Sequence, residues 1–89
     1  MKEPYLEVTY RNGKALAAYF YLPRSGKQKS VRTRQVQRGL IVDFGANGKP
    51  IGIEITAPRQ LTLATLNRLL RELGCAPVRR ADLAPLLAA

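Results

Sequence analysis

The chain has 89 residues, enough for one small domain with a single core, and we expect residues 1–89 to form one domain. Apolar residues make up 46% of the sequence and charged residues 24%, which is typical of a folded globular protein and excludes a disordered one. Fifteen Lys and Arg against six Asp and Glu give a formal net charge of +9. This charge favours an anionic partner, nucleic acid first and an acidic protein second, over a basic partner. A charge that serves only solubility is the simpler alternative.

The sequence lacks residues and motifs that several classes of protein require. The sequence has no histidine, which removes the usual general base near neutral pH and the commonest transition-metal ligand. Cys75 is the only cysteine, so it can form neither a zinc site nor an internal disulfide, and a reducing setting is favoured. No phosphate loop, dinucleotide fingerprint, signal-peptide run or membrane-spanning stretch is present. We therefore expect a non-catalytic, cytoplasmic protein with no cofactor and no membrane contact.

The first two thirds of the chain alternate apolar and polar residues in steps of two, which predicts strands. The expected strands cover residues 5–10, 15–22, 30–36, 40–44 and 51–56. Their connections are short and contain turn residues, such as Arg11–Gly13 and Gln37–Gly39. Short connections make successive strands antiparallel neighbours, and a meander over residues 1–57 is the simplest topology.

The last third changes to steps of three and four, which predicts one main helix over residues 61–74. Thr62 can cap its first turn, and Gly74 can end it in the left-handed conformation. One stripe of this helix is apolar: Leu63, Leu66, Leu69, Leu70 and Leu73. Residues 75–89 follow as a linker and a short helical tail. The predicted fold class is α+β, an antiparallel five-stranded β-meander with one main α-helix packed on one face.

The stretch "DFGANGKPIGIE", residues 43–54, has Asp, Asn, Gly and Glu at four positions of an EF-hand calcium loop. Its flanks alternate like strands, and Gly45 and Ile51 stand where the calcium loop needs oxygen ligands. A β-hairpin explains the segment better, with Asn47 and Gly48 at the centre of a type I′ turn. The pairs that then share one apolar face are Leu40–Ile55, Val42–Ile53 and Phe44–Ile51.

The same hairpin places Asp43 and Glu54 on its opposite face as diagonal neighbours. Two carboxylates in this position could hold a divalent ion or act as acid and base. They could instead form cross-strand ion pairs, with Arg34 or Arg32 opposite Asp43 on the next strand. We favour the structural interpretation, which predicts no metal site.

The stretch from Arg24 to Arg38 contains six cations and no acid: Arg24, Lys27, Lys29, Arg32, Arg34 and Arg38. If Phe20 faces the core, then Tyr19 and Tyr21 share the open face of the sheet with Arg32 and Arg34. Tyrosine beside arginine on an open sheet can stack bases and bind phosphates. These eight residues are therefore the predicted contact surface for nucleic acid or another anionic partner, and a solvated sheet face is the alternative.

The run "TRQVQRGLIVDFGANGKPIGIEITAP", residues 33–58, resembles the core signature of the small bacterial family known as domain of unknown function 2283. The matching positions are Val36, Gly39, Leu40 to Val42, Asp43, Gly48, Gly52, Ile53, Glu54 and Ile55. The resemblance implies a small β-meander with a helix. It implies no activity, because the family has no settled one.

Two functional hypotheses follow. The first is a small basic binding module that contacts nucleic acid, with DNA and RNA equally open. The alternative is a protein-interaction module, such as a toxin–antitoxin component, that binds an acidic partner or forms a homodimer. This alternative would use the open sheet face or the tail from Leu83 to Leu87.

Overall fold

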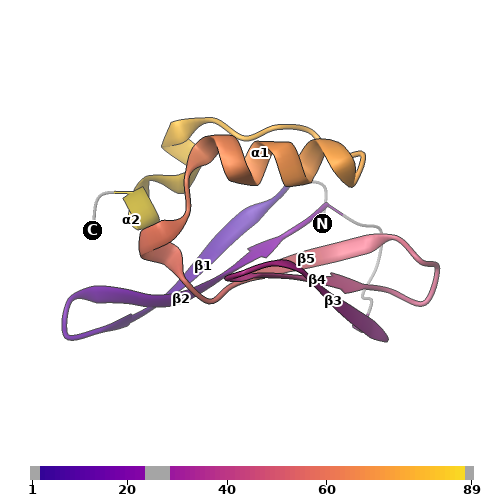
Figure 1. Cartoon of the computed structure of the whole chain (residues 1–89), viewed down its shortest axis with the longest axis horizontal. Helices are drawn as coiled ribbons and strands as arrows, with labels where there is room; N and C mark the ends of the chain where they lie inside the picture. Colours follow the sequence, from indigo (N-terminus) through magenta and orange to yellow (C-terminus); the bar gives the residue numbers. More distant parts are fainter. Residues whose placement is uncertain (1–2, 24–28, 88–89) are drawn as a thin grey trace.

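The computed structural model describes residues 3–23 and 29–87 and shows the predicted α+β fold. Figure 1 shows a five-stranded antiparallel sheet with α1 and the C-terminal segment on one side of it. The elements are β1 (Tyr5–Arg11), β2 (Lys14–Tyr21), β3 (Arg32–Gln37), β4 (Leu40–Phe44), β5 (Pro50–Ile55), the 3₁₀ helix η1 (Pro58–Gln60), α1 (Leu63–Glu72), the 3₁₀ helix η2 (Arg80–Leu83) and α2 (Ala84–Leu87). Among the described residues, no helix has the length and apolar character that crossing a bilayer requires.

The strand order in the sheet is β1-β2-β5-β4-β3. Strands β3, β4 and β5 form a meander, and the β1–β2 hairpin joins the sheet at β5, so that β2 pairs with β5 instead of β3. The last strand in the sequence is therefore the central strand of the sheet. This position suits its residues, because Ile53 and Ile55 are fully buried.

The β4–β5 hairpin confirms the predicted pairs Leu40–Ile55 and Val42–Ile53. The pair nearest the turn is different, because a register shift after Asp43 places Phe44 opposite Pro50 and not opposite Ile51. A shift of this kind accompanies a longer hairpin loop.

The predicted type I′ turn is also wrong. The Gly48 N–H donates to the Gly45 carbonyl at 2.9 Å, so Ala46 and Asn47 are the central residues of the turn. Only Gly48, with φ 81°, has the left-handed conformation there. A type I turn followed by a left-handed glycine is a common three-residue hairpin loop, and here the Asn47 side chain stabilises it by accepting a bond from the Lys49 N–H at 3.0 Å.

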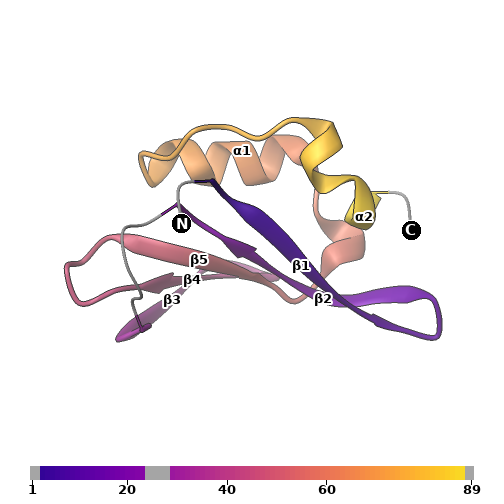
Figure 2. The ribbon, with the colours of Figure 1, turned by 180° about the vertical axis from the view of Figure 1, so that it is seen from behind.

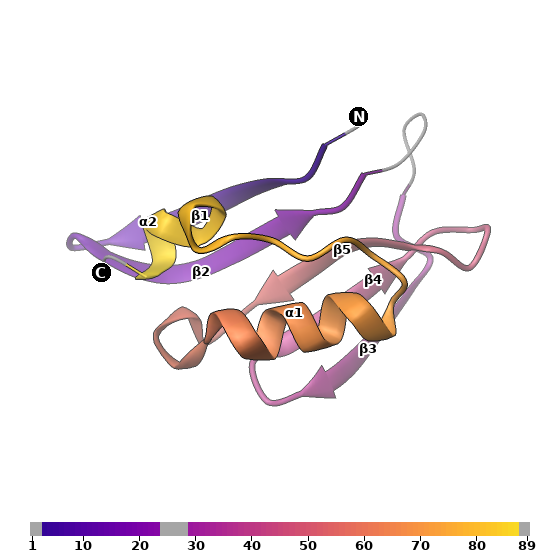
Figure 3. The same ribbon diagram turned by 90° about the horizontal axis from the view of Figure 1, so that it is seen from above.

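Helix α1 has the predicted residues at its two ends, although it covers Leu63–Glu72 and is shorter than the predicted range of 61–74. The Thr62 hydroxyl accepts a bond from the Thr65 N–H at 3.1 Å, and Gly74 has a φ of 76°. The apolar stripe faces the sheet, with Leu66 and Leu70 buried against the core. In the view from above, α1 lies over the β4 and β5 side of the sheet (Figure 3).

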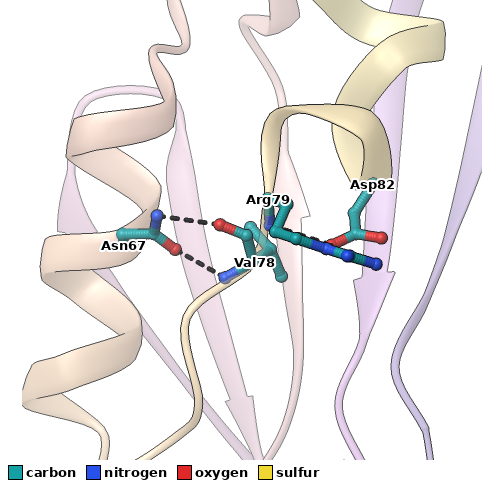
Figure 4. Close-up of polar contacts among 4 residues, drawn as sticks. All are labelled: Asn67, Val78, Arg79 and Asp82. Atoms are coloured by element: carbon teal, nitrogen blue, oxygen red, sulfur yellow. Dashed lines mark hydrogen bonds and ion pairs between the residues drawn. The ribbon is translucent and has the colours of Figure 1, made fainter.

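The segment after α1 turns back across the sheet and places η2 and α2 over β1 and β2 (Figures 2 and 3). Two hydrogen bonds between the Asn67 side chain and the backbone of Val78 tie this segment to α1 (Figure 4). The Asn67 Nδ2 donates to the Val78 carbonyl at 3.0 Å, and the Asn67 Oδ1 accepts from the Val78 N–H at 2.8 Å. Leu83 and Leu86 are buried in the core. The suggestion that these tail leucines form an interaction surface is therefore wrong.

Candidate functional site

The strand register sorts the side chains of the sheet onto two faces, because residues directly opposite each other on paired strands share a face. We call the face away from α1 the open face. Its positions are Tyr5, Glu7, Thr9, Ala17, Tyr19, Tyr21, Thr33, Gln35, Ile41, Asp43, Gly52 and Glu54. These positions, which end at the bulge between Thr9 and Tyr10, include three carboxylates and three tyrosines and no Lys or Arg; the pair Arg11–Lys14 lies beyond the bulge.

The predicted sharing of one face by the tyrosines and the β3 arginines is wrong. Arg32 lies opposite Phe44 and Arg34 lies opposite Val42, which places both arginines on the side of the sheet that α1 covers. The alternation in β3 could not reveal this, because five of its six residues are exposed and no buried set fixes which face each residue takes.

Both arginines lie against one aromatic ring. The guanidinium carbon of Arg32 is 4.9 Å from the centroid of the Phe44 ring, and that of Arg34 is 5.6 Å from it. Both distances are within the range of cation–π contacts. The ring itself is buried, so the two guanidiniums form part of its cover while their side chains stay exposed.

Strand β3 is an edge strand of the sheet, and exposed cations extend along it and beyond both its ends. We call this set the cationic edge: Lys29, Arg32, Arg34 and Arg38. The predicted contacts Arg24 and Lys27 lie outside the described residues. The ion pair that the described part of the chain contains joins Arg79 and Asp82 at 4.0 Å, so no acid there neutralises the cationic edge.

The open face carries a different cluster, built on a hydrogen bond that crosses the central strand. The Tyr19 hydroxyl of β2 donates to Asp43 Oδ2 of β4 at 2.6 Å, and the tyrosine ring passes over Gly52 of β5 to reach it. A Cβ at residue 52 would overlap this ring, so the site requires glycine. A glycine inside a β-branched strand is typical of such a close approach, and this was the sequence signal for the cluster.

Two further tyrosines extend the cluster toward β1. The rings of Tyr5 and Tyr21 stack with centroids 4.4 Å apart at 14°, and Tyr19 packs beside Tyr21 at 4.6 Å. The Tyr21 hydroxyl donates to Glu7 Oε1 at 3.4 Å. Burial first, and then the neighbouring Glu7 and Tyr5, raise the pKa of Tyr21 above its ordinary value.

The register confirms that Asp43 and Glu54 are diagonal neighbours on the open face. The predicted arginine partner of Asp43 is wrong, because Thr33 lies opposite it on β3. Asp43 is only 8% exposed and accepts the bond from Tyr19, whereas Glu54 is exposed. Within residues 3–23 and 29–87, no three of the His, Cys, Asp and Glu side chains gather as metal ligands would.

Comparison with known proteins places part of this arrangement in a family. Residues 17–57 match the family model described as "Protein of unknown function (DUF2283)". The matched segment includes the cationic edge and the three residues of the Tyr19–Gly52–Asp43 crossing. Comparisons with curated proteins and with solved structures give no match. The segment that runs from within β2 to just beyond β5 thus belongs to the DUF2283 family, as the resemblance of residues 33–58 indicated.

Proposed function

We propose that the protein is a non-catalytic, cytoplasmic binding module that holds nucleic acid through the cationic edge. The observation that supports this most is the pair of guanidiniums held over Phe44 on an exposed edge strand. A guanidinium stacked on a ring has a restricted orientation, and its N–H donors point outward from the rim of its plane. Phosphate oxygens can accept from such donors with little further loss of side-chain entropy.

The distribution of acids also supports the cationic edge as the contact. Three of the six acids of the chain lie on the open face, namely Glu7, Asp43 and Glu54. A polyanion is repelled by that face and attracted to the rim where β3 lies. Tyr19 and Tyr21 therefore leave the proposed contact surface, while Arg24 and Lys27 remain in it on the strength of the sequence.

A second candidate is a protein-interaction module with an acidic partner, as in a toxin–antitoxin pair. The specific observation in its favour is that β3 stands last in the strand order, where an edge strand can pair with an added strand. Acidic side chains on the added strand would meet Arg32 and Arg34. A second copy of β3 fits poorly there, because its own arginines would face like charges.

The test is the salt dependence of oligonucleotide binding for two variants that each lose two cations. Arg32→Ala with Arg34→Ala removes the two β3 arginines of the cationic edge, and Arg71→Ala with Arg80→Ala removes two exposed cations of α1 and η2. If two phosphate contacts are lost, the slope of log K against log salt should shrink by roughly 1.4 to 1.8 in the first variant and by much less in the second.

Equal decreases of this slope in the two variants would show that binding depends on the net charge and not on the cationic edge, and would contradict the proposal. A wild-type protein that binds no oligonucleotide, but retains an acidic protein during purification at low salt, would favour the second candidate.

A further inference from the structure

A groove of about 460 Å³ lies at the end of the molecule where the β1–β2 hairpin meets η1. Three of the residues that line it are cations: Arg11 and Lys14 from the hairpin and Arg59 from η1. No acid lines it. We call it the hairpin groove.

The strand register forces two of these cations together. The turn residues Asn12 and Gly13 have φ values of 54° and 75°, which closes a two-residue hairpin turn and sets Arg11 directly opposite Lys14. Like charges directly opposite each other on paired strands destabilise the pairing. Neither cation has an ion-pair partner within the described residues. A bound anion would relieve this repulsion, so the pair itself points to a ligand of negative charge.

The η1 segment supplies the third cation and polar groups suited to an anion. Pro58 starts the 3₁₀ turn, which places Arg59 and Gln60 on the wall that faces the hairpin. The side-chain amides of Asn12 and Gln60 add neutral hydrogen-bond donors to this lining. Leu16, which is 52% exposed, adds an apolar contact. Cationic, amide and apolar groups together are what the phosphates and sugars of a nucleic-acid backbone require.

The hairpin groove is continuous with the cationic edge. Gln60 and Ala57 line the groove and also line a small depression beside Arg38 in the β3–β4 turn. In Figure 3 the turn that precedes α1 lies between the β1–β2 hairpin and the β3–β4 turn, at the same end of the sheet. A chain of phosphates that leaves the cationic edge at Arg38 therefore reaches Arg59 by passing η1.

We propose that the hairpin groove is a second phosphate-binding site, which takes phosphodiester groups of the same nucleic-acid strand that the cationic edge holds. This inference rests on the proposed function. The sequence signal that was missed is "RNGK", residues 11–14, in which two cations flank a two-residue turn and so must lie opposite each other.

The test compares two variants that each lose three cations. Arg11→Gln, Lys14→Gln and Arg59→Gln empty the groove of charge, and Arg68→Gln, Arg71→Gln and Arg80→Gln are the matched control on α1 and η2. Affinity for a labelled oligonucleotide is measured by fluorescence anisotropy across a salt series. The groove variant should lose roughly 2 to 3 from the slope of log K against log salt, and the control less than about 1. Arg59→Gln alone, which leaves the hairpin unchanged, should lose roughly 0.7 to 0.9.

The outcomes separate this inference from the function on which it rests. A groove variant that binds like its control, while Arg32→Ala with Arg34→Ala still loses affinity, would overturn the groove and leave the cationic edge. A wild-type protein that binds no oligonucleotide would overturn both. Circular dichroism melting of each variant confirms folding, and the groove variant should melt no lower than its control because it loses the Arg11–Lys14 repulsion.

Discussion

The two faces of the sheet are stabilised by different interactions. On the covered face, apolar side chains such as Val42 and Ile53 pack under the leucines of α1 and the tail. On the open face, tyrosine rings pack on each other and on Gly52, and their hydroxyls bond to Asp43 and Glu7. An open sheet face can thus be held together by stacked rings and hydrogen bonds, without an apolar cover. Three of the six acids lie on that face, whereas the cationic edge lies along the rim.

The largest expected effect is the cost of truncating a leucine on the covered side, compared with an exposed leucine outside the core. Leu83 is fully buried on the covered side, so Leu83→Ala should lower the free energy of unfolding by about 2–5 kcal/mol. Leu16 is 52% exposed, so the matched variant Leu16→Ala should change it by less than about 0.5 kcal/mol. Urea denaturation measures both. Similar costs would mean that the tail does not close the core.

Gly52 is the position on the open face where an added side chain should be most destabilising. Gly52→Ala places a Cβ in the space of the Tyr19 ring and should cost about 1–3 kcal/mol of unfolding free energy. The same change in a Tyr19→Ala background should cost much less, since the ring is then absent. A double-mutant cycle measures this coupling. Additive effects would show that the glycine is needed for another reason.

The hydroxyls of Tyr19 and Tyr21 should contribute different amounts to the free energy of unfolding. Tyr19→Phe removes the 2.6 Å bond to the buried carboxyl of Asp43 and should cost roughly 1–2 kcal/mol. Tyr21→Phe removes only the exposed 3.4 Å bond to Glu7 and should cost less than about 0.5 kcal/mol. Chemical denaturation at neutral pH provides the comparison, and reversed costs would contradict the assignment of Asp43 to Tyr19.

The smallest expected effect is at alkaline pH. Because folding raises the pKa of Tyr21, the folded state holds this proton more tightly than the unfolded state does. The contribution to stability is therefore complete below the ordinary tyrosine pKa of about 10 and is lost as the pH rises through the folded value. Between these two values, the unfolding free energy of the wild type should fall more steeply with pH than that of Tyr21→Phe. Parallel curves of unfolding free energy against pH would contradict the raised pKa of Tyr21.

The sequence could predict one face of the sheet because burial fixes it. Leu40, Val42, Ile53 and Ile55 must lie on one side, and a slip by one residue would expose all of them. Strand β3 has no such constraint, so the grouping of its cations was predictable but their side of the sheet was not. The predicted β4–β5 turn was displaced by one residue from the observed turn for a similar reason. A type I′ turn and a type I turn followed by a left-handed Gly48 both suit this sequence.

The central position of β5 has a consequence for how the protein folds. The β1–β2 hairpin and the β3–β4–β5 meander can each form from neighbouring segments, but the sheet is complete only when β5 pairs with β2. This step brings together residues far apart in sequence, such as Ala18 and Ile55, and so costs the most loop-closure entropy. The Tyr19–Asp43 bond, which passes over β5, can form only then. Because the chain has no tryptophan, tyrosine fluorescence can follow refolding, and the contribution of Tyr19 is the part that reports on this closure.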